Sequence, residues 1–473
     1  MWEDRSGFSA TKTVAPFESS RNSPDLPSPV TIRVMSLTYA DAVQWYYDFA
    51  RFDPNLPRVP DALKLARMRQ ILASLDHPEE KFPSVLIAGT KGKGSTAALM
   101  ERILRAAGYR TGLFTSPHLH SFRERIRVSG EPITQEQVIQ GTAQLQMVAP
   151  EFPGSTFFEW VTSLAFTFFA QQRVDIAIVE VGLGGRLDCT NVLTPRVAVI
   201  TPISFDHMDI LGHTLTAIAG EKAGIIKPNV PVVVAPQDPE ALQVIVQTAA
   251  QQNAPLINVP ETMCWQLVRV TPDNQRLQLR LKKYARGHLY TLPLLGPHQR
   301  ANLATALAAI HELRAQGWRI PASAIRQGIA QVEWHARFEI LAREPYIVTD
   351  GAHNRASAHE LVRTLDEVFP DAKVHFIFGA STDKDIAGML VELAPRAASL
   401  TFTQSHHARA ATPQALVEIA RPLNIRATIA PSVAAALQVV REKISPNEVI
   451  CVTGSLFIAA DARQLVLELQ PET

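Results

Sequence analysis

The residues of this chain best suited to chemistry lie in a glycine-rich loop that carries two lysines. Residues 84–100 read SVLIAGTKGKGSTAALM, in which an apolar run is followed by the loop and then by an alanine-rich segment. This order predicts a strand, a loop and a helix. Glycines allow successive backbone N–H groups to point into one concavity, while the helix N-terminus and a lysine add positive charge. The loop therefore suits a polyphosphate.

The loop departs from the two best-known phosphate-binding patterns. In the P-loop pattern, Gly-Lys is followed at once by Ser or Thr, whereas here Lys93 is followed by Gly94, and Ser95 comes one place late. The dinucleotide pattern is met only in a looser form, with Ala97 where the third glycine usually stands. A plain strand-to-helix turn is the alternative, but two lysines in a turn between buried elements argue against it.

Polar side chains stand at the carboxyl ends of three further predicted strands. The strands cover residues 111–115, 174–181 and 196–201, and the side chains are Ser116, Glu180 and His207. Parallel strands end at one sheet edge, where α/β proteins bind ligands. A buried carboxylate must be paired or bound to a cation, and oxygen ligands beside phosphates suit Mg²⁺. We therefore predict a metal site beside the loop; the alternatives are a capping role for Ser116 and a structural role for His207.

Composition limits the class of protein. A chain of 473 residues is too long for one ordinary core, so two or three domains are expected. Lys and Arg number 46 against 45 Asp and Glu, which speaks against bulk nucleic-acid binding or a polybasic membrane anchor. The three cysteines match neither a disulfide framework nor a zinc site, which favours a reducing cytoplasm. No apolar run reaches the length of a membrane span.

The pattern along the chain predicts a tail and two α/β domains. We expect residues 1–36, rich in Ser and Pro, to be a disordered tail, with Met35 as a candidate start of the native protein. Residues 37–333 are expected to form the phosphate-binding domain, and residues 334–343 a linker. A fresh β-α alternation predicts a smaller, doubly wound domain over residues 344–473. Two such domains in series usually place the active site between them.

Other segments are expected to support these domains. Helical spacing of apolar residues predicts two helices within residues 37–74, and a buried helix over 156–171, where the helix dipole favours Glu159 in the first turn. Residues 264–293 alternate in short pieces, which predicts antiparallel hairpins appended to the first domain. Strands of the second domain are predicted at residues 346–349, 374–378, 400–403 and 448–452.

Taken together, the motifs resemble those of the Mur-ligase-like ATP-dependent amide ligases, and within them the folylpolyglutamate synthase/dihydrofolate synthase branch. The motifs occupy residues 89–95, 115–119, 158–159, 180–188, 190–191, 206–207, 211–212, 221–225, 298–299, 302 and 350–354. They follow the family's order from about residue 40 to the C-terminus. The one-place shift in the phosphate loop is this branch's own form.

The resemblance implies a role for each matching residue. It places the phosphates of ATP on Gly89, Thr90, Lys91, Gly92, Lys93, Gly94 and Ser95. It assigns nucleotide contacts to Asn302, Arg337 and Asp350, one Mg²⁺ to Ser116 and Glu180, and a second to His207. Lys93, Lys222 and His207 are the catalytic residues that it implies.

Lys222 looks like the family's carbamylated lysine, whose added carboxylate turns a cation into a metal ligand. Carbamylation needs a neutral amine, so the site must favour deprotonation. From the residues alone, Lys222 fits a solvated surface lysine as well.

The resemblance also implies substrate-binding residues. Phe158 and Asp188 match positions that stack on and hydrogen-bond a pterin, and His353 and Ser455 would lie on the glutamate side.

The implied reaction joins L-glutamate to a folate or dihydropteroate carboxyl through an acyl phosphate, releasing ADP and phosphate. The alternatives are a Mur-type ligase acting on another carboxylate, and a nucleotide-binding regulatory protein that has lost catalysis. The joint presence of Ser116, Glu180, His207 and Lys222 argues against the latter. We expect small-molecule substrates, no nucleic acid or membrane partner, a monomer, and a cytoplasmic location.

Three positions depart from the family's usual pattern. The usual Trp-Pro-Gly-Arg at the domain linker is Trp-His-Ala-Arg at residues 334–337, which loses the Pro-Gly turn. Arg355 replaces the usual proline after residues 350–354, and Lys91 replaces an asparagine common in bacterial members. The linker geometry is therefore the part of the resemblance least fixed by the sequence.

Overall fold

The computed structural model describes residues 37–49, 61–283, 286–407 and 409–470. The expected tail over residues 1–36, with its candidate start at Met35, lies outside the described residues. None of the helices in the described ranges combines the length and the apolar character needed to span a membrane.

An eight-stranded sheet forms the centre of the first α/β region, in the order β4-β3-β2-β5-β1-β6-β7-β8. The six strands from β2 to β8 in this order are parallel, and β3 and β4 extend the β2 edge antiparallel. The strands are β1 (Ser84–Ala88), β2 (Thr111–Phe114), β3 (Ile126–Val128), β4 (Glu131–Pro132), β5 (Ile176–Glu180), β6 (Val197–Ile200), β7 (Val232–Val234) and β8 (Leu256–Asn258).

Helices follow the strands of this region, as the βαβ pattern predicts. They are α1 (Tyr39–Asp48), α2 (Asp61–Ser74), α3 (Lys93–Ala106), α4 (Gln135–Val148), α5 (Phe157–Gln171), α6 (Met208–Leu211), α7 (Leu215–Ala223), α8 (Pro239–Gln251), α9 (Val259–Thr262), α10 (Pro297–Ala315) and α11 (Ala322–Ala330). Val85 and Ile87 share one buried cluster with α3, α10 and α11. Because successive strand side chains point to opposite faces, β1 is buried on both sides.

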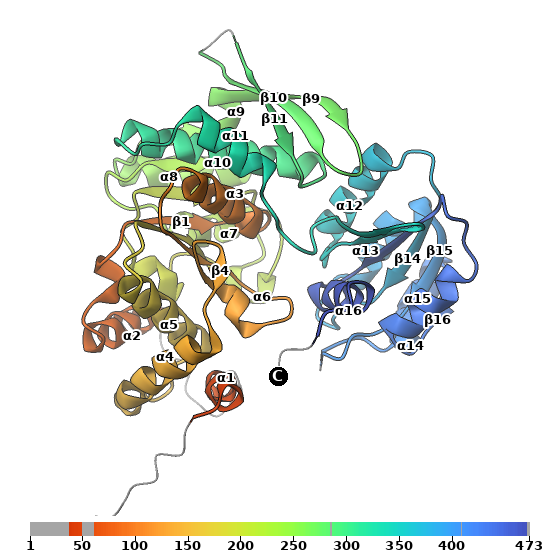
Figure 1. Ribbon diagram of the computed structural model, residues 1–473, viewed down its shortest axis with the longest axis horizontal. Helices are drawn as coiled ribbons and strands as arrows, with labels where there is room; N and C mark the ends of the chain where they lie inside the picture. Colours follow the sequence, from red (N-terminus) through yellow and green to blue (C-terminus); the bar gives the residue numbers. More distant parts are fainter. Residues whose placement is uncertain (1–36, 50–60, 284–285, 408, 471–473) are drawn as a thin grey trace, which may run out of the picture. The chain divides into compact units, whose positions relative to one another are not determined.

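A three-stranded antiparallel sheet is appended to this region, as the alternation predicted. Its strands are β9 (Met263–Val270), β10 (Gln275–Leu281) and β11 (His288–Leu292), in the order β11-β10-β9. Leu277, Leu279 and Leu292 join the cluster that contains α10 and α11, so the sheet packs against these helices (Figure 1).

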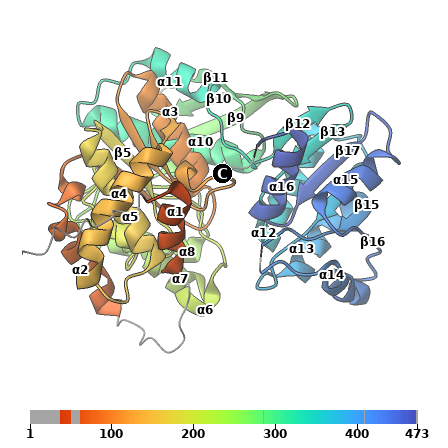
Figure 2. The same ribbon diagram turned by 60° about the horizontal axis from the view of Figure 1, so that its bottom comes forward.

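The second α/β region is built on a six-stranded sheet, in the order β12-β13-β17-β14-β15-β16. Its strands are β12 (Glu339–Arg343), β13 (Tyr346–Thr349), β14 (Val374–Phe378), β15 (Ala397–Phe402), β16 (Thr428–Ile429) and β17 (Val449–Thr453). Its helices are α12 (Arg355–Val368), α13 (Ile386–Leu393), α14 (Pro413–Ala420), α15 (Val433–Arg441) and α16 (Leu456–Val466). One buried cluster joins α12, α13 and α14 to the sheet and another joins α15 and α16, so helices cover both faces (Figure 2).

The four strands predicted in this second region are confirmed, and two edge strands were missed. β16 has two residues, too few to give an alternation that a sequence pattern can reveal. β12 pairs antiparallel with β13, so the last five residues of the expected linker form an edge strand of the sheet.

The buried helix α5 begins with a capping box that holds a charged pair. The side chain of Thr156 accepts a hydrogen bond from the Glu159 N–H, and the Glu159 carboxylate accepts one from the Thr156 N–H. Arg67 of α2 donates two hydrogen bonds to the same carboxylate, at 2.8 and 2.7 Å. The two side chains are only 13% and 6% exposed. Glu159 thus has the structural role expected from its place in the first turn, and it also anchors α2.

We expect Arg67→Met to lower the free energy of unfolding by about 3 kcal/mol, because it leaves a buried carboxylate without its cation. Urea denaturation followed by circular dichroism measures the loss. The control is Arg421→Met, which removes a largely exposed pair with Glu418 and should cost at most about 1 kcal/mol. Equal losses in the two variants would contradict the buried pair's importance.

Candidate functional site

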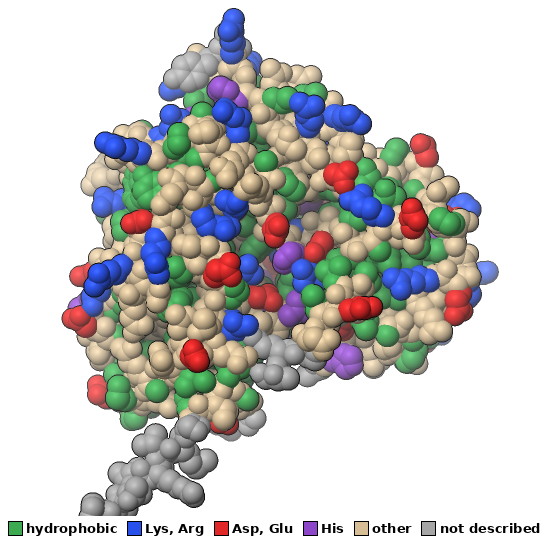
Figure 3. All heavy atoms as spheres, in the orientation of Figure 1, with side chains coloured by type: hydrophobic (Ala, Val, Ile, Leu, Met, Phe, Trp, Pro, Cys, Tyr) green, Lys and Arg blue, Asp and Glu red, His purple; other side chains and the backbone are tan. Residues whose placement is uncertain are grey.

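The predicted site residues gather around one cavity of about 1160 Å³. It is lined by the phosphate loop, by the carboxyl edge of the eight-stranded sheet, by the first turns of α10 and α12, and by the loop after β13. Histidine, acidic and basic side chains surround a hollow in the face shown in Figure 3. The predicted residues that line the cavity are Gly89, Thr90, Lys91, Gly92, Lys93, Gly94, Ser95, Ser116, Glu180, His207, Lys222, Asn302, Arg337, Asp350 and His353.

The phosphate loop takes its shape from two close approaches. Gly92 caps α3 with φ +79°, and a Cβ at this position would lie 2.2 Å from the Asn302 side chain. A Cβ on Gly89 would lie 1.8 Å from the hydroxyl of Thr201. Only glycine fits at either position. The N–H groups of Thr90 and Lys91 both donate to the Pro202 carbonyl, at 3.0 and 3.1 Å, which ties the loop to the end of β6.

Glu180 and Ser116 lie together at the ends of β5 and β2. The Glu180 carboxylate accepts a hydrogen bond from the Ser116 N–H at 3.1 Å, and the Lys93 ammonium lies 3.8 Å away. Burial raises the pKa of Glu180, and the opposing effects of Lys93 and Ser116 do not fully offset it. This carboxylate therefore has less positive charge around it than its burial demands. A carboxylate and a hydroxyl beside a phosphate loop are donors that fit Mg²⁺.

His207 lies on the same cavity wall, at the N-terminus of α6. Its backbone is left-handed, with φ +50°, and its ring is 48% exposed. Burial and the neighbouring cations Lys384 and Lys222 lower its pKa, against the effect of Asp206. The neutral imidazole, which is the form that binds metals, is thus favoured at neutral pH.

Lys222 is a buried lysine, so its interpretation as a solvated surface residue is wrong. Its side chain lies within the fold at the last turn of α7, with 4% of the residue exposed, and its Nζ donates to the Gly89 carbonyl at 3.0 Å. Burial, followed by the charge of Lys93, lowers its pKa to about 7. A neutral amine is therefore available near neutral pH, which is the condition that carbamylation requires.

The linker bends at two residues with left-handed backbone, although it lacks the Pro-Gly turn of the family's usual motif. Ala336 and Phe338 both adopt left-handed backbone, with φ +54° and +48°, on either side of Arg337. The N–H of Ala336 donates to the Glu339 carboxylate at 2.8 Å, and His335 lies 3.0 Å from the same carboxylate. Arg463 of α16 donates to it at 3.0 Å. Hydrogen bonds from three directions thus hold a conformation that glycine would adopt unaided.

This bend places Arg337 beside Asp350 and Glu180, the two carboxylates with which it interacts electrostatically. The Asp350 oxygens accept hydrogen bonds from the N–H groups of Phe338 and Ala352, both at 2.8 Å. The Asn302 amide donates to Gln299, whose own amide donates to the Ser95 hydroxyl. Of the predicted nucleotide-contacting residues, Asn302 is therefore linked to the phosphate loop through Gln299.

Three predicted residues do not line the cavity: Phe158, Asp188 and Ser455. The Phe158 ring packs against Gly182, where a Cβ would lie 2.5 Å from it. Asp188 accepts hydrogen bonds from the N–H groups of Gly182 and Leu183 and from Thr190. Ser455 caps α16 by accepting from the Ile458 N–H at 3.2 Å. In this structure the first two residues shape the glycine loop that follows Glu180.

Asp206 belonged to a recognised motif but was given no role by the sequence. Its carboxylate accepts from the Asn354 amide at 3.2 Å and lies 3.5 Å from Lys91, 3.7 Å from Lys384 and 3.9 Å from His353. Burial acts to raise its pKa, but these neighbours, above all Lys91, lower it to about 2. Lys384 was missed, although it stands after a strand's carboxyl end, the same signal that identified Ser116.

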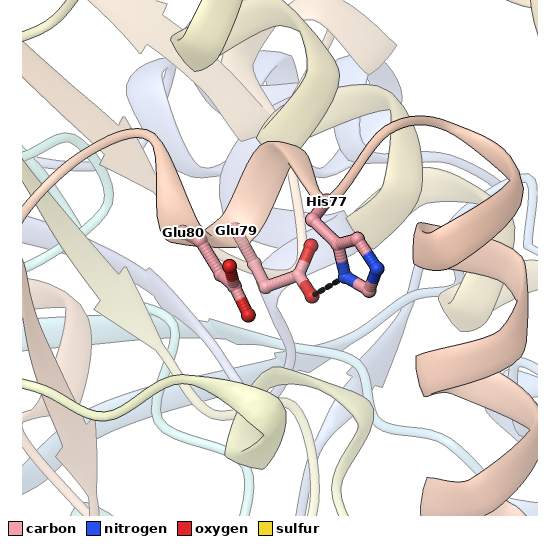
Figure 4. A group of neighbouring side chains, drawn as sticks. All are labelled: His77, Glu79 and Glu80. Carbon is pink, nitrogen blue, oxygen red and sulfur yellow. Dashed lines mark hydrogen bonds and ion pairs between the residues drawn. The ribbon is translucent and has the colours of Figure 1, made fainter.

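A second group of donors lies outside this cavity. Among the described residues, His77, Glu79 and Glu80 have ligand atoms within 4.8 Å of one another (Figure 4). His77 and Glu80 are exposed, and the Glu79 carboxylate is hydrogen-bonded to the His77 ring at 3.3 Å. The three residues precede the amino end of β1, whereas the phosphate loop follows its carboxyl end. They are therefore separate from the predicted metal ligands.

Comparison with known proteins agrees with this geometry. Residues 87–310 match the Mur ligase middle domain, and residues 336–456 match the Mur ligase glutamate ligase domain. Fold and site therefore define a Mur-type ligase, an enzyme class that forms amide bonds.

Proteins that are similar over nearly the full chain identify the branch of this enzyme class. The dihydrofolate synthase/folylpolyglutamate synthase of Bacillus subtilis is 35% identical over 440 residues, covering 91% of this chain and 99% of the relative. A Mycobacterium tuberculosis folylpolyglutamate synthase structure with ADP superposes with a TM-score of 0.80 at 32% identity, over 92% of this chain and 99% of that one. The Yersinia pestis bifunctional synthase with AMPPNP and a Mn ion gives 0.79 at 30%, over 90% and 98%. The chain belongs to the folylpolyglutamate synthase/dihydrofolate synthase family of ATP-dependent ligases.

Lys222 should make the free energy of unfolding increase with pH. Because folding lowers its pKa from 10.5 to about 7, the unfolded chain binds more protons between these values, and stability rises with pH. In CO₂-free buffer, we expect the unfolding free energy of the wild type to rise relative to Lys222→Met by about 1 kcal/mol per pH unit between about pH 7.5 and 9.5. Urea denaturation measures it. Lys373→Met, at a lysine whose side chain is 72% exposed, should show no such relative change; parallel curves for wild type and Lys222→Met would refute the assignment.

Proposed function

We propose that this enzyme uses ATP to join the amine of L-glutamate to a carboxyl group of reduced folate, and also of dihydropteroate. The observation that carries the proposal is the single cavity that combines the phosphate loop, the Glu180–Lys93 pair and groups from the second sheet. The Bacillus subtilis and Mycobacterium tuberculosis relatives are both named dihydrofolate synthase/folylpolyglutamate synthase, which supports both acceptors.

In the first step, a carboxylate oxygen of the acceptor attacks the γ-phosphorus of ATP. The bond from that phosphorus to the bridging oxygen of ADP breaks, and an acyl phosphate forms. The negatively charged carboxylate and phosphate repel one another, so the protein's main contribution to catalysis is to neutralise charge where they meet. Lys93, held by Glu180, is placed to do so at the phosphate loop.

In the second step, the neutral amine of glutamate attacks the acyl carbon. The bond from that carbon to the phosphate oxygen breaks, inorganic phosphate leaves, and the nitrogen loses a proton. The acyl phosphate is also open to attack by water, so a site recessed between two sheets favours amide formation over hydrolysis.

Mg²⁺ is the metal that the site suits, with Ser116 and Glu180 at one position and His207 at a second. When bound, such ions neutralise charge on the transferring phosphoryl group. Carbamylation of Lys222 would supply a further carboxylate beside Gly89. The depressed pKa of Lys222 supports that modification, because the neutral amine is the form that adds to CO₂.

The remaining assignments extend this proposal. Phe158 and Asp188 would contact the pterin, with Asp188 exchanging one of its present backbone partners for the ligand. His353 and Ser455 would lie on the glutamate side. We propose domains over residues 37–333 and 344–473 joined by 334–343, and a monomer that acts in the cytoplasm, where the free thiols of Cys189, Cys264 and Cys451 suit a reducing compartment.

We expect the purified protein to release ADP with ATP, Mg²⁺ and L-glutamate when either tetrahydrofolate or 7,8-dihydropteroate is the acceptor. Glu180→Gln should lower turnover at least about 100-fold, because it removes the charge that holds Lys93 and suits the metal. Glu101→Gln, at a buried carboxylate on α3 that bonds Thr111, is the matched control and should stay active.

The acceptors separate the possible outcomes. Turnover with tetrahydrofolate alone would restrict the enzyme to polyglutamylation and remove support for the pterin roles of Phe158 and Asp188. Turnover with neither acceptor would overturn the folate assignment in favour of a Mur-type ligase acting on another carboxylate.

We expect Lys222→Ala to lose most activity and to regain part of it in added formate, because a small carboxylate can occupy the place of the carbamate. Steady-state ADP release with and without formate measures the rescue, and Lys93→Ala serves as the variant that formate should not restore. Full activity of Lys222→Ala without any additive would exclude a carbamate role.

A further inference from the structure

The segment between α2 and β1 gathers three metal-ligand side chains outside the cavity. Its centre is a short 3₁₀ turn, η1 (Pro78–Glu80), which the Glu80 N–H closes by donating to the His77 carbonyl at 3.2 Å. In such a turn, side chains three positions apart lie on the same side. His77 and Glu80 therefore flank Glu79, whose carboxylate lies between the other two side chains in Figure 4. One ligand atom from each lies within 4.8 Å of the others.

Packed side chains on either side of the donors hold the backbone of this turn. Pro78 is buried. Phe82 is 6% exposed, and its ring makes edge-on contacts with Phe166 and Phe169 of α5, with centroid distances of 5.9 and 5.8 Å. The three donors are thus presented from an ordered backbone. A ligand that binds them has little main-chain entropy to remove, which favours binding.

The carboxylates of this turn carry negative charge without a basic partner. In the part of the chain that the structure describes, no Lys or Arg forms an ion pair with Glu79 or Glu80. Lys81 comes next in the sequence, but its ammonium lies 2.5 Å from the Asp76 carboxylate instead. The neighbour of the Glu79 carboxylate is the His77 ring, 3.3 Å from its Oε1. The turn therefore combines two negative charges with one imidazole.

Glu79 is the residue that points to a ligand. Its side chain is only 10% exposed, and its Oε2 is buried and accepts no hydrogen bond from any described residue. Burying a carboxylate oxygen without a partner is unfavourable, because the oxygen loses its hydration and gains no interaction in exchange. A cation held by this carboxylate and by the two exposed side chains beside it would supply the interaction that Oε2 lacks.

We propose that His77, Glu79 and Glu80 bind one Zn²⁺ ion, with water as a further ligand. An imidazole nitrogen and carboxylate oxygens are donors that Zn²⁺ takes, whereas Mg²⁺ is bound through oxygen. The ion neutralises both carboxylates and holds the turn that joins α2 to β1. Because this turn precedes the amino end of β1 and the phosphate loop follows its carboxyl end, the site is distinct from the cavity. The inference does not depend on the proposed function.

Calorimetric titration of the tag-free protein with Zn²⁺, in excess Mg²⁺, tests the proposal. We expect one site that persists in Glu180→Gln, a variant that removes a predicted metal ligand of the cavity. Loss of an outer-shell partner alone costs metal sites about 10- to 100-fold in affinity, so His77→Gln should weaken binding at least about tenfold, and Glu80→Gln should weaken it too. The matched control is His406→Gln, at an exposed histidine that lies 3.8 Å from the single carboxylate of Asp461, and it should bind Zn²⁺ like the wild type.

X-ray absorption at the zinc edge identifies the ligands of the bound ion. We expect nitrogen and oxygen ligands at about 2.0–2.2 Å, with the imidazole scattering missing in His77→Gln. Sulfur at about 2.3 Å would assign the ion to a cysteine and overturn the proposal.

Two results of the titration would also overturn it: no Zn²⁺ binding by the wild type, or the same affinity in the wild type, His77→Gln and Glu79→Gln. Circular dichroism verifies that each variant is folded. Should Glu79→Gln fail to fold, His77→Gln and Glu80→Gln carry the comparison, because both of these residues are exposed.

Discussion

The structure around the cavity depends on keeping charge buried at the carboxyl edge of a parallel sheet. Glu180 ends a strand that is buried along its whole length, and Lys93, the Ser116 N–H and the charges of Arg337 and Arg125 partly offset the cost of burying its carboxylate. Lys93 is the first residue of α3, and Ser116 follows β2, so one electrostatic requirement ties together the ends of three neighbouring strands, β2, β5 and β1. The lowered pKa of Lys222 has a related cause: burial disfavours its charged form, and the nearby charge of Lys93 adds to the effect.

The same constraint extends to the second sheet. Its strands β13 and β14 end in loops that carry His353, Asn354 and Lys384, and these groups meet the Asp206 carboxylate that follows β6. In the linker, the Arg337 guanidinium interacts electrostatically with a carboxylate of each region, Asp350 and Glu180. Two sheets that each end in polar loops can approach closely only if their charges complement one another, and here carboxylates from one side face cations from the other.

The sequence predicted most of this architecture because its signals are local. The apolar runs of β1, β13 and β14 and the glycines of the phosphate loop each predict the local structure from a few neighbouring residues. Ser116, Glu180 and His207 were found by one rule, that polar groups after parallel strands meet at an edge, whereas the other cavity residues outside the phosphate loop were assigned their roles by the family resemblance. The same rule applied to Lys384 as well, but nothing nearby in the sequence indicated that Asp206 would be its partner. Arg67 and Glu159 are separated by 92 positions, so their pairing exists only in three dimensions. For Asp188, the pattern identified the residue, yet only the structure shows that backbone N–H groups already use its carboxylate.

The linker lacks the Pro-Gly of the family's usual motif but keeps its outer residues, Trp334 and Arg337. Trp334 packs against Gly94 of the phosphate loop, where a Cβ would lie 2.8 Å from its ring, and Arg337 keeps its place beside Asp350. Between these two fixed points Ala336 stands where the family's usual motif has glycine, and its left-handed backbone is held at the expense of some local strain. Alanine adopts this dihedral angle because hydrogen bonding of its N–H to the Glu339 carboxylate fixes the chain. A search for the letters Pro-Gly would pass over this linker, although Trp334 and Arg337, the outer residues of the motif, are both in place.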